Sequence, residues 1–178
     1  MTFAKKLIAI DQHTRPGQPL RRVTGVVIHY VQWPGATAQR IRDYFDALPR
    51  TEPGRYASAH YAVGLEGEII QMVPEEEVAW HAGPSSKTRR EVETRLGGKP
   101  NWRTIGIELC HPDASGAFLR ATWNAAVELT ADIMQRHGIA IETRILRHYD
   151  CTGKLCPLWM VNNGADWTEF VRETGARI

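Results

Sequence analysis

The stretch VTGVVIHYV, residues 23–31, decides the fold of this chain. Its β-branched residues and its short, continuous apolar run are typical of a buried β-strand. Alternate side chains of a strand point to opposite faces, so His29 lies on the same face as Val27 and Val31. An imidazole buried without a partner costs free energy. We therefore expect His29 to be either a hydrogen-bonded core histidine or a metal ligand.

Strands and helices alternate along the rest of the chain. The predicted elements are a helix that begins at the N-cap Thr37, a hairpin of HYAVG (60–64) and EIIQMV (68–73), a strand over 104–110, a helix over 121–138, a strand over 143–148 and a closing helix over 166–173. The pattern predicts a single α/β domain over 1–178, with a mixed central β-sheet flanked by α-helices. We expect its core over about 20–160 and its C-terminal helix over about 166–174.

The composition fits one soluble globular domain. The chain has 178 residues, of which 43% are apolar and 24% charged, enough for a real core. A net charge of +2 is too small to indicate nucleic acid as a partner, although it is compatible with an anionic polymer such as a bacterial cell wall. Three cysteines do not make a disulfide framework, and they indicate reduced thiols or metal ligands.

The first residues, MTFAKKLIAIDQH, resemble a signal peptide only briefly. The apolar run ends at Asp11, too early for a secretory core, and no small-residue cleavage site follows. No segment approaches the roughly 20 apolar residues of a membrane span. We expect a monomer that is cytoplasmic as synthesised, has neither membrane nor nucleic acid as a partner, and acts elsewhere only after release.

The segment RHYDCTGKLCP, residues 147–157, carries the densest chemistry. His148 ends a predicted strand, and Cys156 lies in a turn-rich stretch. Lys154 precedes Cys156 by two residues, so in an extended segment both side chains point to one side. Taken alone, His148 is also compatible with a surface histidine, and Cys156 with a buried thiol or a nucleophile paired with His148. With His29, however, the two residues match the three protein ligands of a catalytic zinc, which leaves one position for water.

A carboxylate interrupts the predicted strand TIGIELC, residues 104–110. Alternation places Glu108 on the face of Gly106 and Cys110, in the middle of an otherwise apolar strand. An unpaired buried charge is costly, so Glu108 is either half of a buried ion pair with a nearby arginine or a general base. The second interpretation suits a carboxylate beside a metal.

Five motifs in this order resemble one known family. The motifs VVIHY, SAHYAV, EVAWHAG, TIGIELC and RHYDCTGKLCP are similar to those of the zinc-dependent N-acetylmuramoyl-L-alanine amidases of the type 2 class. This class includes phage endolysins, bacterial autolysins and the peptidoglycan recognition proteins. The resemblance covers about residues 20–160, and IELCHPDASGAF most resembles the prophage endolysin and autolysin branch from Gram-positive hosts.

The resemblance implies roles for individual residues. One zinc ion per chain would be held by His29, His148 and Cys156, with Glu108 as the catalytic glutamate and Lys154 as the lysine two residues before the third ligand. The implied reaction is hydrolysis of the amide between the N-acetylmuramoyl group and L-alanine in peptidoglycan.

Further positions follow from the same resemblance. Trp80, His81 and Asn101 match residues that line the substrate groove. Some relatives have a catalytic tyrosine where this chain has Ala59, so the neighbouring Tyr61 does not inherit that role. His60 also has a family counterpart, for which a structural role is an alternative.

Two rival functions remain open at this point. The first is a peptidoglycan-binding module on the same fold, although such modules typically lack a zinc ligand. The second is a metal-independent thiol hydrolase that uses Cys156 and His148, which explains neither His29 nor Glu108.

The polar segment over 81–103 is predicted to be a long loop that forms one wall of the groove. Its basic residues either meet the carboxylates of a stem peptide or form a solvated surface. These residues are Lys87, Arg89, Arg90 and Arg95.

Overall fold

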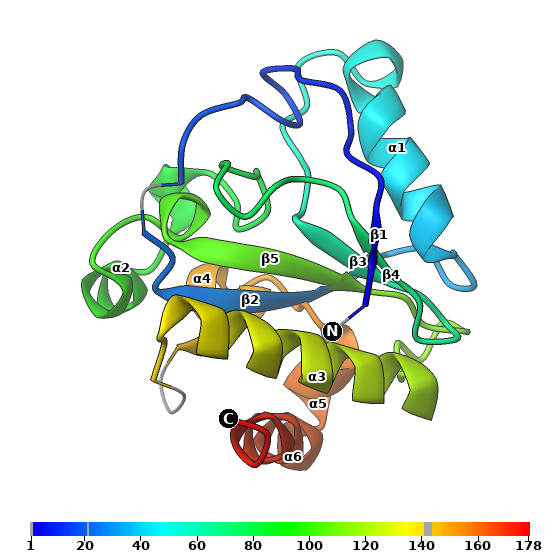
Figure 1. Cartoon of the computed structure of the whole chain (residues 1–178), viewed down its shortest axis with the longest axis vertical. Coiled ribbons are helices and arrows are strands. Elements are labelled where there is room, and N and C mark those ends of the chain that lie inside the picture. Colours follow the sequence, from blue (N-terminus) through cyan, green and yellow to red (C-terminus); the bar gives the residue numbers. More distant parts are fainter. Residues whose placement is uncertain (1, 21, 141–143) are drawn as a thin grey trace.

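One mixed β-sheet runs through the middle of the molecule, with helices on both faces (Figure 1). The computed structural model describes residues 2–20, 22–140 and 144–178. The strands are β1 (Ala4–Lys5), β2 (Gly25–Tyr30), β3 (Tyr61–Val63), β4 (Ile69–Gln71), β5 (Thr104–Leu109) and β6 (Ile145–Arg147). They lie in the order β1-β4-β3-β5-β2-β6; β3 and β4 pair antiparallel, and the other neighbours pair parallel.

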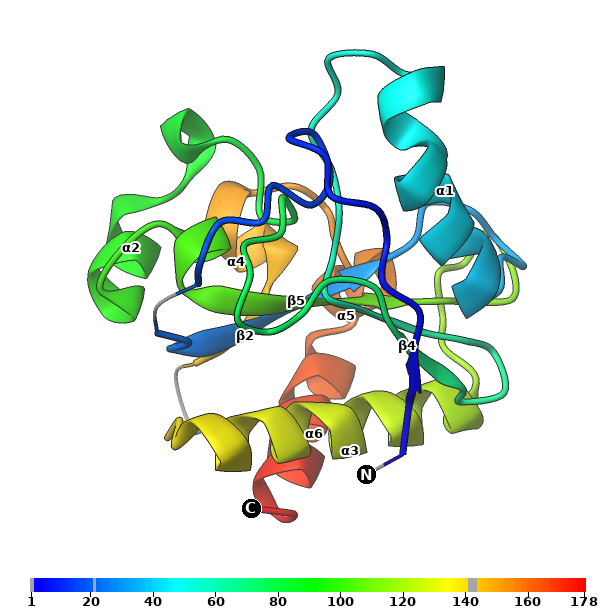
Figure 2. The same ribbon diagram turned by 45° about the horizontal axis from the view of Figure 1, so that its top comes forward.

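Two layers of helices enclose this sheet. The helices are α1 (Ala38–Thr51), α2 (Arg90–Leu96), α3 (Arg120–His137), α4 (His148–Thr152), α5 (Leu158–Asn162) and α6 (Gly164–Gly175), with 3₁₀ turns η1 (Ser85–Lys87) and η2 (Pro100–Trp102). The long α3 covers one face and α6 packs against it, whereas α1 lies over the opposite face (Figure 2). The expected α/β architecture, a mixed sheet flanked by helices, is confirmed.

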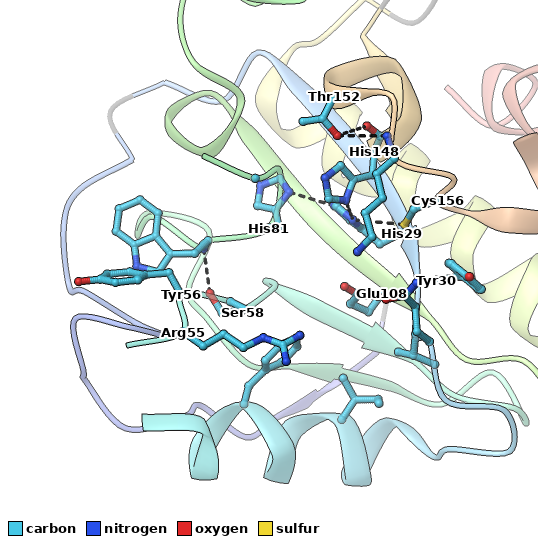
Figure 3. Close-up of a pocket in the computed structure, with 18 of the residues that line it drawn as sticks. His29, Tyr30, Arg55, Tyr56, Ser58, His81, Glu108, His148, Thr152 and Cys156 are labelled. Atoms are coloured by element: carbon cyan, nitrogen blue, oxygen red, sulfur yellow. Dashed lines mark hydrogen bonds between the residues drawn. The ribbon is translucent and has the colours of Figure 1, made fainter. Parts of the chain in front are cut away.

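The central strands β2 and β5 have two chemically different faces. Val26, Ile28 and Ile107 point towards α3 and belong to the largest apolar cluster. His29 and Glu108 point the other way and are direct partners in the parallel β2–β5 ladder (Figure 3). The alternation expected from the sequence therefore places both residues on one face of the sheet.

Local signals in the sequence identified several boundaries correctly. The Thr37 side chain caps α1 by accepting a hydrogen bond from the backbone N–H of Arg40 at 3.2 Å. Gly138 ends α3 in a left-handed conformation, with φ of 60°. The β3–β4 hairpin turns at Gly67, whose φ of 82° favours glycine.

The prediction of a structureless loop over 81–103 was wrong. This segment contains α2, which buries Val92 and Leu96 against Val27 and Leu146. Only two apolar residues anchor the seven-residue helix, so its amphipathic pattern is too short to recognise in the sequence.

The expected strand over 143–148 is shorter than predicted. Strand β6 covers Ile145–Arg147, and His148 is the first residue of α4. Thr143 lies outside the described residues. The pairing of β6 with β2 ends at Arg147, and helix α4 begins at the next residue. The tertiary pairing therefore decides where the strand ends.

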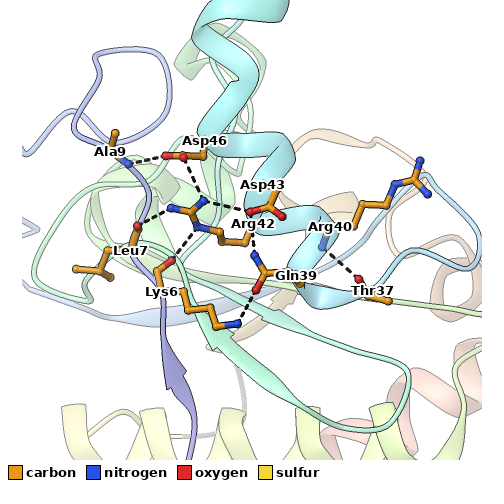
Figure 4. Close-up of polar contacts among 9 residues, drawn as sticks. All are labelled: Lys6, Leu7, Ala9, Thr37, Gln39, Arg40, Arg42, Asp43 and Asp46. Carbon is orange, nitrogen blue, oxygen red and sulfur yellow. Dashed lines mark hydrogen bonds and ion pairs between the residues drawn. The ribbon is translucent and has the colours of Figure 1, made fainter.

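The N-terminal segment is extended and lies along the edge of the sheet and beside α1. Arg42 on α1 donates from Nη2 to the Leu7 carbonyl at 2.9 Å, and Asp46 accepts from the Ala9 N–H at 2.7 Å (Figure 4). Because β1 pairs with β4, it also covers that strand's otherwise open edge. Among the described residues, no helix combines the length and apolar character that crossing a membrane requires.

Candidate metal centre and the groove around it

Three side chains from two distant parts of the chain meet on the polar face of the sheet. His29 comes from β2, His148 from the start of α4 and Cys156 from the segment after α4 (Figure 3). The two Nδ1 atoms of the histidines are 3.1 Å apart, and Cys156 Sγ is 3.8 Å from His29 Nδ1. All three donor atoms lie within 4.8 Å of one another.

This spacing fits a tetrahedral zinc ion. Zinc–nitrogen bonds of about 2.0–2.1 Å and a zinc–sulfur bond of about 2.3 Å place two nitrogens about 3.3 Å apart, and nitrogen about 3.6 Å from sulfur. The observed distances of 3.1 and 3.8 Å are close to these values. Two imidazoles and one thiolate are also donors that zinc prefers. The three residues therefore suit a zinc ion with one open position.

Strand pairing brings the ligands together. In the β2–β6 ladder Ile28 pairs with Arg147, so the next residues, His29 and His148, lie side by side. Gly153 then turns the chain with φ of 84°, and the Tyr149 N–H donates to the Cys156 carbonyl at 2.9 Å. This turn returns Cys156 to the two histidines.

Burial keeps the two imidazoles neutral. Burial lowers the pKa of His29 well below its usual value, and the charges of neighbouring groups lower it further. Burial and the positive charge of Lys154 lower the pKa of His148 to about 4. Burial raises the pKa of the Cys156 thiol to about 12. A metal ion would displace the thiol proton, so metal binding here releases a proton.

Glu108 stands beside this ligand set with an unused oxygen. Its Oε2 is buried and has no hydrogen-bond partner among the described residues. Burial raises the pKa of Glu108 to about 7, and the positive charge of Lys154 opposes that rise. None of the ion pairs found in the described residues includes Glu108, so the expected alternative of a buried ion pair with an arginine finds no support. An unpaired carboxylate of this kind is suited to accept and return a proton.

The candidate metal centre lies in a cavity of about 930 Å³. Besides the three ligands, Glu108 and Lys154 line it, which places the ammonium and the carboxylate in one compartment. The wall nearest α1 contributes Tyr44 and Arg55. The cavity is open to solvent at Lys154, which is exposed.

The three residues expected to line the groove occupy different positions. Trp80 and His81 line the cavity. The Asn101 amide is instead bonded to backbone groups of the loop that follows His81: its Oδ1 accepts from the Ala82 N–H at 2.7 Å, and its Nδ2 donates to the Gly83 carbonyl at 3.1 Å. Their contact with a substrate stays a prediction.

His60 has structural contacts. Its Nδ1 accepts from the Gly106 N–H at 3.0 Å, and its Nε2 lies 3.0 Å from the Glu77 carbonyl. Tyr61 points to the opposite face of the sheet, where its hydroxyl donates to Glu75 at 2.6 Å.

Of the four basic residues singled out in the 81–103 segment, Lys87 lines the cavity. Arg89 lies over the Tyr149 ring, 5.2 Å from its centroid. Sequence reasoning missed Arg55 and Tyr56, which line the cavity from the loop after α1. Nothing in their local pattern distinguishes them from an ordinary surface loop, because only the packing of that loop against the sheet turns it into a cavity wall.

The site combines two histidines and a cysteine at metal-binding distance with an unpaired carboxylate and an ammonium. This combination is typical of metal-dependent hydrolases. The sequence model of the Amidase_2 family, described as N-acetylmuramoyl-L-alanine amidase, matches residues 19–159. The chain belongs to this family, and the resemblance inferred from its motifs is confirmed.

Curated relatives point the same way. N-acetylmuramoyl-L-alanine amidase CwlL from Bacillus licheniformis is 37% identical over 166 residues, which cover 93% of this chain and 44% of the relative. N-acetylmuramoyl-L-alanine amidase BlyA from Bacillus subtilis is 31% identical over 181 residues, covering 99% of this chain and 47% of the relative. The chain thus spans about half the length of these relatives.

Solved structures share the fold. The structure of PlyL superposes with a TM-score of 0.76 at 24% identity, and the match covers 98% of this chain and 97% of that one. A mutant endolysin from Bacillus subtilis superposes with a TM-score of 0.74 at 27% identity, covering 98% of this chain and 99% of the other.

Proposed function

We propose that this chain is a zinc-dependent catalytic domain that hydrolyses the amide between N-acetylmuramoyl residues and L-alanine in peptidoglycan. The observation that carries this proposal is the juxtaposition of His29, His148 and Cys156 with the unpaired Oε2 of Glu108. Membership of the amidase family supports the choice of bond. We further propose one zinc ion per chain, a single domain and a monomeric state.

Each residue then has a defined task. His29, His148 and Cys156 would hold the zinc ion, which when bound supplies a Lewis acid that polarises the scissile carbonyl and acidifies a water molecule. Glu108 accepts a proton from the attacking water as the new carbon–oxygen bond forms. It then returns that proton to the alanine nitrogen as the carbon–nitrogen bond breaks, so that the protons balance.

Lys154 is suited to stabilise negative charge. Its ammonium lines the same cavity as Glu108, and its positive charge acts on both Glu108 and His148. In the tetrahedral intermediate the carbonyl oxygen becomes an oxyanion, which a nearby fixed cation stabilises. Trp80, which lines the same cavity, offers an aromatic surface for the muramyl peptide.

A chelator experiment tests the proposal. Purified protein is incubated with peptidoglycan, and newly released N-terminal alanine is measured with and without a strong chelator. We expect activity to disappear with the chelator and to return with added zinc. Indifference to the chelator would favour a thiol hydrolase, and wall binding without alanine release would favour a binding module.

Family membership supports a proposal for the biological setting. We propose a role as a phage or prophage endolysin or an autolysin, which acts on the cell wall after release. Several relatives of similar sequence are named as amidases of Bacillus species. Lysis of intact cells by the purified protein, supplied from outside, would support action on the cell wall, and failure to degrade intact walls would contradict it.

A further inference from the structure

His81 contacts a proposed zinc ligand on the side away from the metal. We infer that His81 is a positioning residue, which fixes the ring orientation and the tautomer of His29 so that His29 Nδ1 faces the zinc ion. The inference rests on the zinc site of the proposed function, but not on the identity of the substrate. Three sets of contacts carry it.

First, Thr104 determines where His81 carries its proton. His81 Nε2 lies 3.3 Å from the Thr104 carbonyl oxygen and 3.3 Å from the Thr104 hydroxyl. That hydroxyl donates its own hydrogen to the Pro100 carbonyl at 2.8 Å, so towards His81 it presents a lone pair. Because both neighbouring atoms are acceptors, the hydrogen of neutral His81 resides on Nε2.

Second, this tautomer determines that of His29. With its hydrogen on Nε2, His81 presents a lone pair at Nδ1, which lies 3.1 Å from His29 Nε2 (Figure 3). His29 must then donate from Nε2, which leaves its Nδ1 lone pair directed at His148 and Cys156. Only this tautomer of His29 can bind a metal with Nδ1. Metal-bound histidines generally donate their other ring nitrogen in this way.

Third, the surrounding chain is shaped to hold the His81 ring. A side-chain Cβ at Gly106 would lie 2.5 Å from His81 Cγ, so the glycine on β5 leaves the space that the ring occupies. Asn101 Oδ1 accepts from the His81 backbone N–H at 3.1 Å, which anchors the residue to the turn before β5. The rings of His29 and His81 meet edge to face, at an interplanar angle of 89°.

Zinc affinity provides the test. In a competition assay with a chromophoric chelator, we expect His81→Phe to weaken zinc binding about 10- to 100-fold, as loss of such hydrogen-bonding partners typically does. His81→Asn keeps an acceptor near the Nδ1 position, and we expect it to recover part of the loss. Cobalt(II) substitution adds a spectroscopic readout, because changed ligand geometry alters the visible absorption of the bound metal.

His111→Phe is the matched control. His111 is also buried, and its ring nitrogens contact the Asp113 and Val31 carbonyls at 2.6 and 2.7 Å rather than any proposed ligand. The control therefore also removes a buried imidazole that hydrogen-bonds to the backbone, but its zinc affinity should stay within about twofold of the wild type. A loss in His111→Phe equal to that in His81→Phe would overturn the inference, since general destabilisation would then explain both.

Tautomers in the zinc-loaded wild type give a measurement that needs no variant. Nitrogen-15 NMR of the histidine rings should find hydrogen on Nε2 of both His29 and His81. Hydrogen on His81 Nδ1, or unchanged zinc affinity in His81→Phe, overturns the inference while leaving the proposed function intact. A wild-type protein that binds no zinc overturns the proposed function itself.

Discussion

The two faces of the β2–β5 pair show how one short stretch of sheet serves two purposes. Towards α3 the strands present residues such as Ile28 and Ile107, which are fully buried in an apolar cluster. Towards the cavity they present His29, whose ring contacts two other histidines, and Glu108, whose Oε2 has no hydrogen-bond partner among the described residues. The apolar face stabilises the fold, and that stability lets the other face keep an unpaired carboxylate that would be costly in a weaker scaffold.

The largest effect should come from the polar face. Glu108→Gln removes the proton acceptor while keeping the shape, and we expect the rate of alanine release to fall by about 10²- to 10⁴-fold. Zinc content and melting temperature should stay close to those of the wild type, because Glu108 is not one of the proposed ligands and forms no ion pair with the residues that the structure describes. Near wild-type turnover in Glu108→Gln would show that another group transfers the proton.

A substitution on the apolar face should lower the stability of the fold and leave the activity nearly unchanged. Ile107→Ala removes a fully buried side chain, and we expect it to lower the free energy of unfolding by about 2–5 kcal/mol. Activity per folded molecule should change little at temperatures well below the melting transition. Denaturant unfolding and activity at 20 °C, measured on one preparation, separate the two faces; a large loss of turnover without loss of stability would contradict this division.

Gly106→Ala tests a position where the two roles meet. The added Cβ would lie 2.5 Å from His81 Cγ, so the ring must shift. We expect overpacking to cost about 1–3 kcal/mol of stability. Zinc affinity should also fall, by about tenfold, because displacement of His81 disturbs His29. Calorimetric unfolding of the metal-free protein and zinc titration report the two effects separately, and unaltered values of both would show that the ring has free space.

The smallest effect concerns pH. Burial raises the pKa of Glu108 to about 7, and a general base must be ionised, so kcat/KM should rise with pH up to that region and then level off. Bound zinc would move this limb to lower pH, since it adds positive charge. Lys154 also lowers the pKa of Glu108, so Lys154→Met should shift the limb to higher pH as well as slow the reaction. A pH–rate profile with an unmoved limb would show that the ammonium does not act on Glu108.

The sequence predicted more of the site than of its surroundings. His29 and Glu108 could be placed on one face because strand alternation is a local rule, and the β2–β5 register agrees with it. The motif around Cys156 predicted, through its resemblance to the family, that His148 and Cys156 meet His29, and the three donor atoms do lie within 4.8 Å of one another. In contrast, α2 was taken for loop, since a helix anchored by two apolar side chains forms only through its tertiary contacts.

Residue type and alternation by themselves determined the fold class and the face of the sheet on which His29 and Glu108 lie, because these depend on intrinsic chemistry and on strand periodicity. Only the tertiary structure decided what His81 contacts. Its sequence position indicates a groove residue, but the acceptors of Thr104 and the space above Gly106 direct its ring against His29. Packing of the folded chain determines which residues far apart in the sequence form hydrogen bonds, so a local sequence pattern cannot predict them.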